Sequence, residues 1–131
     1  MRIALKRTLL YHLQIIERDY MCLDLSIAQG TDLQIRSLET LGLSIDRLRM
    51  IVDSSPVSQN TLCPIVRHDI FNQITVIGGF AQLLQEKRVG PLANESRLYL
   101  EKILIARMHI ETALVVDKPN DAEQAALGHS A

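Results

Sequence analysis

Apolar residues recur along the chain at alternating steps of three and four residues, the spacing of one face of an α-helix. They form four separate stripes, divided by segments rich in Gly, Pro, Ser and Asn. The first two stripes are Leu9, Leu13, Ile16, Tyr20, Leu23 and Ile27, then Leu38, Leu41, Ile45, Leu48 and Val52. The third is Ile70, Ile74, Ile77, Ala81 and Leu84. The fourth is Tyr99, Ile103, Ala106, Ile110 and Ala113, widened by Leu100, Leu104 and Leu114. No strand pattern and no internal sequence repeat stands out, so we predict four amphipathic helices.

Local signals indicate where these helices begin and end. Gly30 is suited to close the first helix in the left-handed conformation, and Thr31 with Gln34 forms a capping-box pattern for the second. The uncharged segment 54–66 carries two prolines and is read as a joint between two halves. We expect the third helix over about residues 64–86 and the fourth over about residues 94–116.

The four helices are expected to pair as two antiparallel hairpins in an all-α fold. The division is residues 1–56 for the N-terminal hairpin, 57–117 for the second hairpin and 118–131 for a flexible tail. One two-helix hairpin cannot enclose a core, so the second hairpin is expected to pair with a second copy into a dimeric four-helix bundle. Its stripe could instead be covered by the first hairpin of the same chain, in an intramolecular bundle.

Composition and charge narrow the function classes. The chain has 131 residues, 47% of them hydrophobic, with 14 Lys and Arg against 15 Asp and Glu. This near-neutral balance disfavours a nucleic-acid partner, because binding to phosphate backbones needs clustered cations. The longest uncharged stretch, Ile70–Gln85, is too short and too polar to span a bilayer. We therefore expect a cytoplasmic protein without a membrane span, in which Cys22 and Cys63 are reduced and buried.

Polar side chains cluster at the start of the third predicted helix. His68 and Asn72 are four residues apart and project to one side of a helix, with Asp69 next to the histidine and Gln73 next to the asparagine. His68 falls off the line of buried apolar residues, so we expect its ring to be open to solvent. A neutral imidazole is a nucleophile, and an adjacent carboxylate can hold its second nitrogen in the right tautomer. These groups suit the acceptance of a phosphoryl group.

The string from Arg67 to Gln73, together with Gly79-Phe80-Ala81-Gln82-Leu83-Leu84, resembles the phosphoacceptor box of sensor histidine kinases. The resemblance covers about half the chain, the third and fourth helices. It implies that His68 is the phosphoacceptor, that Asp69 is the acid/base that orients it, and that Asn72 positions water. Two residues depart from the common pattern of the family, which has a basic residue at the place of Phe71 and Pro at the place of Gln73. Gln73 is similar to one kinase subgroup that has Gln at that place.

The resemblance also implies partners. Nothing in the chain is similar to the ATP-binding domain of these kinases, so we expect this chain to bind no cofactor and no metal itself. ATP and magnesium would be supplied by a separate kinase catalytic domain, and the phosphoryl group would pass to an Asp of a response-regulator receiver domain. The chain is then a stand-alone phosphotransfer protein or part of a longer kinase. The alternative is a non-catalytic helical dimer that acts as an adaptor or inhibitor of a kinase or response regulator.

The other histidines and the paired glycines have plainer interpretations. His12 and His109 have no carboxylate neighbours at metal-site spacing and are expected to be ordinary helix residues, and His129 belongs to the tail. Gly78 and Gly79 lie inside the third helix, where each costs about 1 kcal/mol of helix stability. They indicate a soft point or a close contact with another helix.

Overall fold

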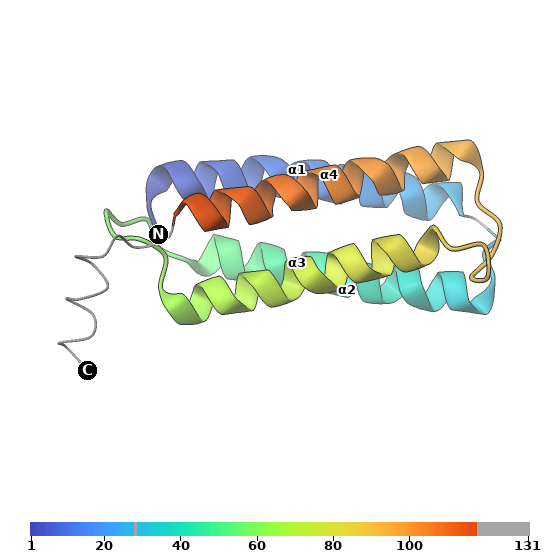
Figure 1. Ribbon diagram of the computed structural model, residues 1–131, viewed down its shortest axis with the longest axis horizontal. Coiled ribbons are helices and arrows are strands. Elements are labelled where there is room, and N and C mark those ends of the chain that lie inside the picture. Colours follow the sequence, from blue (N-terminus) through green and yellow to red (C-terminus); the bar gives the residue numbers. More distant parts are fainter. Residues whose placement is uncertain (28, 118–131) are drawn as a thin grey trace.

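The structure is a computed structural model that describes residues 1–27 and 29–117, so the predicted tail lies outside the described residues. All regular secondary structure in these ranges is helical, which confirms the all-α prediction. The helices are α1 (Ile3–Ser26), α2 (Asp32–Ser54), α3 (Pro64–Leu84) and α4 (Asn94–Val116). They run along the long axis of the molecule and alternate in direction (Figure 1).

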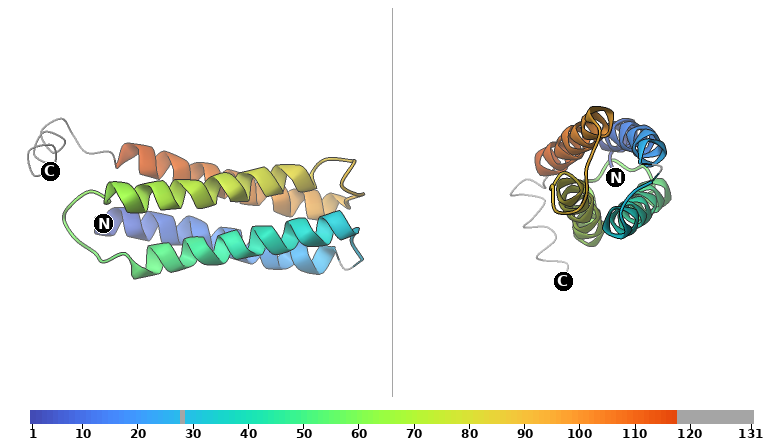
Figure 2. Two further views of the ribbon diagram at one scale, coloured as in Figure 1. Left: turned by 90° about the horizontal axis from the view of Figure 1, so that it is seen from below. Right: turned by 90° about the vertical axis from the view of Figure 1, so that its right-hand side faces the viewer.

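The four helices form one bundle within a single chain. Each helix packs against two others, α1 against α2 and α4, and α3 against α2 and α4. Seen end-on, the helices occupy four corners around a common axis (Figure 2). The α2–α3 loop, the N-terminus and the end of α4 therefore lie together at one end, and the two hairpin turns lie at the other (Figure 1).

The hydrophobic core is formed largely by the apolar stripes that were predicted from the sequence. Every predicted residue of the α2 and α3 stripes is buried, and so are Leu9, Leu13, Ile16 and Leu23 of α1. Of the predicted stripe residues, Tyr20, Ile27, Tyr99 and Ala113 are only partly buried. Of the three residues expected to widen the α4 stripe, Leu100 and Leu114 are buried and Leu104 is partly buried. The buried side chains of all four helices belong to one hydrophobic cluster.

This arrangement covers the α3 and α4 stripes with the chain's own α1–α2 hairpin. The predicted antiparallel hairpins are present, whereas a dimeric bundle is not shown. The physical reason for expecting a second copy was an uncovered stripe on the second hairpin. In the structure that stripe is buried, with Ile74, Ile77 and Leu100 all 0% exposed within one chain.

The two hairpins repeat each other in register, a feature that inspection of the sequence did not reveal. In α1, Leu9, Leu13, Ile16 and Leu23 are buried, and in α3 Ile70, Ile74, Ile77 and Leu84 follow with identical steps. In α2 and α4 the matching sets are Leu38, Leu41, Leu48 and Val52, and Leu100, Ile103, Ile110 and Leu114. Because α1 packs on α4 as α3 packs on α2, the bundle has an approximate internal two-fold symmetry.

The turns show which local signals were correct. The capping box is present, since Gln34 N–H donates to Thr31 Oγ1 (3.1 Å) and Thr31 N–H donates to Gln34 Oε1 (2.9 Å). The expected left-handed Gly30 is wrong: α1 ends at Ser26, the cap is Ile27, and Gly90 is the described residue with positive φ, at 153°. A Cβ at Gly90 would also stand 2.6 Å from the Gln34 side chain.

The cysteines form no disulfide, as predicted, but their expected burial is not observed. Cys22 is partly buried and Cys63 is exposed. Cys63 is the N-cap of α3 and lies in the joint before the helix, where its side chain is not buried in the bundle core. None of the described helices has the length and apolar run required to cross a membrane.

We expect the chain to be monomeric, because its stripes are already covered. Size-exclusion chromatography with light scattering at micromolar concentration should give the mass of one chain, 14.7 kDa. A dimer mass would contradict this expectation and would favour the homodimer inferred from the sequence.

Candidate functional site

The candidate site lies on the first turns of α3. The helix starts with Pro64 at its first position, where the missing N–H costs nothing, and the N-cap Cys63 makes no side-chain cap. Ile70 and Ile74 then fix which face is buried. His68, Asp69 and Asn72 are all exposed, which confirms that the His68 ring is open to solvent.

His68 and Asn72 are brought together as their spacing predicted. Asn72 Nδ2 lies 3.4 Å from His68 Nε2. With the ring proton on Nδ1, Nε2 carries the lone pair and the Asn72 amide donates to it. Asp69 is exposed at the neighbouring position. The Asn72 amide therefore orients an exposed imidazole through its Nε2 atom.

Gln73 has a different set of contacts from the other three candidates. Its side chain is partly buried on the flank that faces α2. Ser44 Oγ of α2 donates to Gln73 Oε1 at 2.7 Å and lies 3.2 Å from the Gln73 carbonyl oxygen. The structure therefore gives Gln73 a role in joining α3 to α2 just behind His68.

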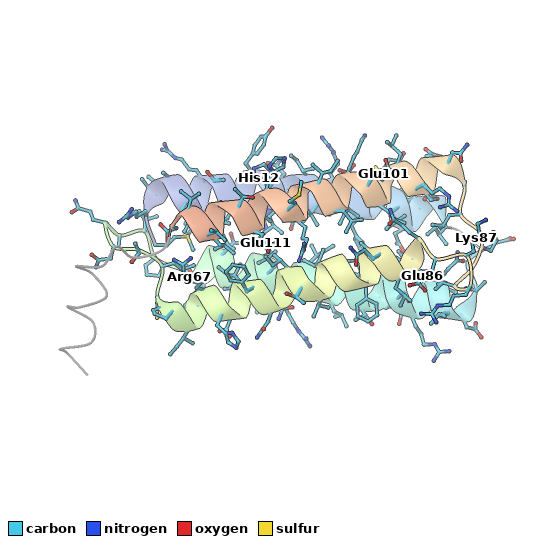
Figure 3. All side chains as sticks on the ribbon, in the orientation of Figure 1. His12, Arg67, Glu86, Lys87, Glu101 and Glu111 are labelled. Atoms are coloured by element: carbon cyan, nitrogen blue, oxygen red, sulfur yellow. The ribbon has the colours of Figure 1, made fainter. Side chains whose placement is uncertain are left out.

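The contacts of Arg67 with the end of α4 were not predicted from the sequence. Its guanidinium, labelled in Figure 3, donates to the carbonyl oxygens of Leu114 and Asp117 at the end of α4, the latter at 2.9 Å. It also pairs with Asp117 Oδ2 at 3.2 Å, and the same oxygen accepts the Leu62 N–H at 3.1 Å. The residue directly before His68 thus anchors the start of α3 to the end of α4.

Lys6 is related to Arg67 by the internal symmetry and caps the end of α2 in the same way, but without an ion pair to a described carboxylate at that end. Lys6 stands three residues before Leu9, as Arg67 stands three residues before Ile70. Lys6 Nζ donates to the carbonyl oxygens of Ser55 (2.6 Å) and Asp53 (3.3 Å) at the end of α2. A basic residue three positions before the matching buried residues Leu9 and Ile70, which caps the second helix of its own hairpin, is the signal that identifies Arg67. In the same register, Arg7 occupies the place of His68.

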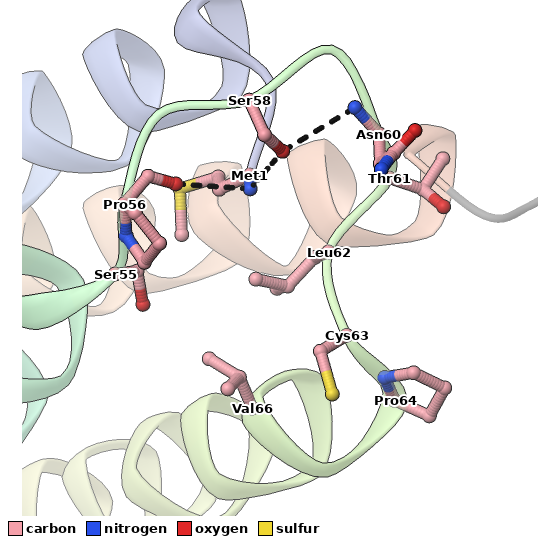
Figure 4. Close-up of a pocket in the computed structure, with 10 residues that line it drawn as sticks. All are labelled: Met1, Ser55, Pro56, Ser58, Asn60, Thr61, Leu62, Cys63, Pro64 and Val66. Carbon is pink, nitrogen blue, oxygen red and sulfur yellow. Dashed lines mark hydrogen bonds between the residues drawn. The ribbon is translucent and has the colours of Figure 1, made fainter.

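A cavity of about 530 Å³ lies at this end of the bundle, between the α2–α3 loop and the start of α3 (Figure 4). Ser58 closes one side, since its Oγ accepts from the Met1 ammonium at 2.9 Å. Cys63, Pro64 and Val66 form the side toward α3. His68 is not among the residues that line this cavity.

The paired glycines have different environments. A Cβ at Gly78 would stand 2.8 Å from Arg107 Nε, and that nitrogen donates to the Ile74 carbonyl oxygen at 3.0 Å. A Cβ at Gly79 would meet nothing within 4 Å. Gly78 therefore marks the expected close helix contact, and Gly79 leaves open space on the exposed face of α3.

His12 and His109, expected to be ordinary helix residues, stack on each other across two helices. Their rings stack with centroids 4.9 Å apart and an interplanar angle of 17°, and Tyr11 meets His12 edge-on at 5.1 Å. Burial, with the neighbouring His109, lowers the pKa of His12. The spacing of a single helix could not show this pair, because it forms between α1 and α4.

Searches for metal sites and for related proteins add no further assignment. Within residues 1–27 and 29–117, no group of three or more His, Cys, Asp and Glu side chains is placed to hold a metal ion. Comparison with models of protein families, with curated proteins and with solved structures finds no match.

Proposed function

We propose that this chain is a histidine phosphotransfer protein of two-component signalling, in which His68 accepts a phosphoryl group and passes it to a receiver Asp. The observation that carries the proposal is the exposed His68 ring on α3 with Asn72 Nδ2 at 3.4 Å from Nε2. The resemblance of residues 67–84 to the phosphoacceptor box of sensor kinases supports the same role.

The proposed step forms a phosphorus–nitrogen bond at Nε2. The Asn72 amide first releases Nε2, whose lone pair then attacks phosphorus, and the bond between phosphorus and the donor's oxygen breaks with its electron pair on that oxygen. The proton on Nδ1 is then lost, and Asp69 is the adjacent carboxylate that can accept it. In the second step a receiver carboxylate attacks the same phosphorus, the phosphorus–nitrogen bond breaks with its electron pair on Nε2, and the proton returns from Asp69 to Nδ1. Asn72 would orient the ring, and a water when an aspartyl phosphate is hydrolysed.

The surface around His68 suits a protein donor and acceptor better than a small substrate. His68 does not line the cavity at the end of the bundle, and its exposed ring is open to a phosphoryl donor carried on a partner's surface. Along α3 the exposed residues after His68 and Asp69 are uncharged: Asn72, Thr75, Gly79 and Gln82. A neutral face with open space at Gly79 lets a partner approach closely without desolvating charges.

The internal symmetry shapes the proposal further. The α1–α2 hairpin occupies the place that a second copy would take in a dimeric bundle, and Arg7 stands where a second acceptor would be. We therefore propose one acceptor for each bundle, rather than the two of a homodimer. ATP and magnesium would come with a separate kinase catalytic domain, since phosphoryl transfer from ATP needs a phosphate cradle beside the nucleophile.

Chemical phosphorylation by phosphoramidate tests the proposal without a known partner. Intact mass and phosphorus NMR should show that His68 is labelled first, ahead of His12 and His109. His12 should react most slowly, because its ring is partly buried and stacked on His109. His68→Ala should abolish the fast phase completely.

The matched control is His109→Ala, which removes an exposed histidine outside the candidate site. It should leave the fast phase unchanged. If His68 reacts no faster than His109, the acceptor role is refuted. The non-catalytic adaptor would then be the better account, and His68→Ala would keep its binding to a kinase or response regulator.

A further inference from the structure

The contact between α1 and α4 contains a stacked pair of imidazole rings, His12 of α1 and His109 of α4. The ring centroids are 4.9 Å apart, and His12 lies on the side of the bundle where α1 and α4 meet (Figure 3). His109 is exposed, whereas the His12 ring is partly buried and its Nδ1 atom is buried without a hydrogen-bond partner. A protonated imidazole carries an N–H on both nitrogens, so a charged His12 would place a donor where there is no acceptor. The stack therefore favours a neutral His12.

The symmetry-related contact between α3 and α2 satisfies the polar group at this place. Gln73 stands at the position of His12, and Ser44 stands at the position of Ala106, which lines the same groove as His12. Ser44 Oγ donates to Gln73 Oε1 at 2.7 Å. Neither side chain titrates near neutral pH. The helix packing of this fold therefore does not require a histidine, and the two contacts should respond differently to acid.

A second buried polar atom lies further along the α1–α4 contact. Asp19 is 2% exposed, and its Oδ2 has no hydrogen-bond partner, since Arg18 Nη2 is 3.7 Å away. The symmetry-related residue of α3 is Phe80, which packs against the core. Unpaired buried polar groups destabilise the contact that buries them. The α1–α4 contact thus carries two such groups where the α2–α3 contact has a hydrogen bond and an apolar side chain.

The groups around His12 make its protonation unfavourable in the folded chain. Burial lowers the pKa of His12 below its ordinary value of 6.5, and the neighbouring His109 lowers it further. The unfolded chain then binds the proton more readily, so the stability that a neutral His12 allows is present above about pH 6.5 and is lost as the pH falls through the lowered pKa. The other helix packed on α1, α2, supplies none of the described side chains that line the groove. The charged and titratable side chains that line it are His109 and Lys102 on α4 and Tyr11, Arg18 and Asp19 on α1.

We propose that the α1–α4 contact is a pH-sensitive switch, which is closed while His12 is neutral and opens when His12 takes up a proton. The protonated ring repels His109 once that ring is also charged, and its Nδ1–H finds an acceptor only in water. The His12 ring therefore leaves the stack, and α1 separates locally from α4. The α2–α3 contact, which is held by Gln73 and Ser44, stays closed.

Thiol reactivity at two symmetry-related positions measures the opening. Ile15 lines the groove one turn after His12, and its counterpart on α3 is Val76, which is also partly buried. Ile15→Cys and Val76→Cys are each made in the full chain with Cys22→Ala and Cys63→Ser, so that one thiol remains. The rate of its reaction with a dithiodipyridine reagent is divided by the rate of the same chain unfolded in urea at the same pH. This ratio removes the effect of thiol ionisation and gives the protection by the fold.

Protection of the thiol in Ile15→Cys should fall at least about threefold between about pH 7.5 and about pH 5.5, and protection in Val76→Cys should stay constant. Carboxylates remain ionised over this range, so the ion pairs of the bundle are kept. If both thiols lose protection equally, acid acts on the whole bundle and the proposal is overturned. It is also overturned if the thiol of Ile15→Cys is equally protected at both pH values.

Two variants identify His12 as the group that responds. His12→Gln/Ala106→Ser copies the Gln73–Ser44 pair into the α1–α4 contact, and His12→Leu places an apolar side chain there. Combined with Ile15→Cys, each should remove the pH dependence of thiol protection, and His12→Leu provides the test should the double variant not fold. An acid response that persists without His12 would overturn the proposal. The phosphoacceptor site takes no part in this contact, so that failure would leave the phosphotransfer proposal intact.

Discussion

Replacing Arg67 with Met is expected to lower the free energy of unfolding by about 3 kcal/mol. The side chain is 13% exposed and its partner Asp117 is 6% exposed, so both charges are largely removed from water. Met fills the volume but leaves the Asp117 carboxylate, which accepts the Leu62 N–H, without the Arg67 cation, and it removes the donors that cap the end of α4. Urea unfolding followed by circular dichroism measures the change.

The internal symmetry supplies the control for this substitution. Lys6→Met removes the equivalent cap from α2, but no carboxylate is left behind, so the expected loss is about 1 kcal/mol. In the double variant Arg67→Met/Asp117→Asn, the stranded charge is gone and part of the stability should return. Equal losses for Arg67→Met and Lys6→Met would show that the ion pair adds nothing to the cap.

Much of the fold followed from hydrophobic periodicity, because a helix at this spacing has one face to bury. The stripes of α2 and α3 were predicted completely, and the capping box at Thr31 was correct. Periodicity could not show which hairpin covers which stripe, since that depends on the joint between the halves. The burial of Asp19 could not be predicted either, because a charged residue is expected to be exposed to solvent unless the neighbouring helices are known to cover it.

The candidate site was predicted only in part, because the sequence pattern shows contacts within one helix but not contacts between helices. The exposure of His68 and its pairing with Asn72 depend on the spacing within one helix, which the sequence contains. The contact of Gln73 with Ser44 and the anchor from Arg67 to Asp117 join different helices. Those contacts depend on the packing of the bundle, and a single helix pattern holds no information about them.

Truncating Ile74 to Ala should cost about 3 kcal/mol and should destabilise the whole chain, not only the second hairpin. Ile74 is 0% exposed in the cluster that all four helices share. Its symmetry-related residue, Leu13, is equally buried, so Leu13→Ala should cost a similar amount. Both variants should unfold in one transition, with the same midpoint by helical signal and by the exchange of amide protons in α1 and α3.

The outcome decides whether the hairpins are separate folding units. If each hairpin formed its own core, Leu13→Ala would lower the protection of amides in α1 and α2 alone, and Ile74→Ala would affect α3 and α4 alone. Two transitions would then separate in urea, and residues 57–117 would stand as an independent domain. A single transition would mean that the surface bearing His68 depends for its stability on the α1–α2 hairpin, which takes the place of a second subunit.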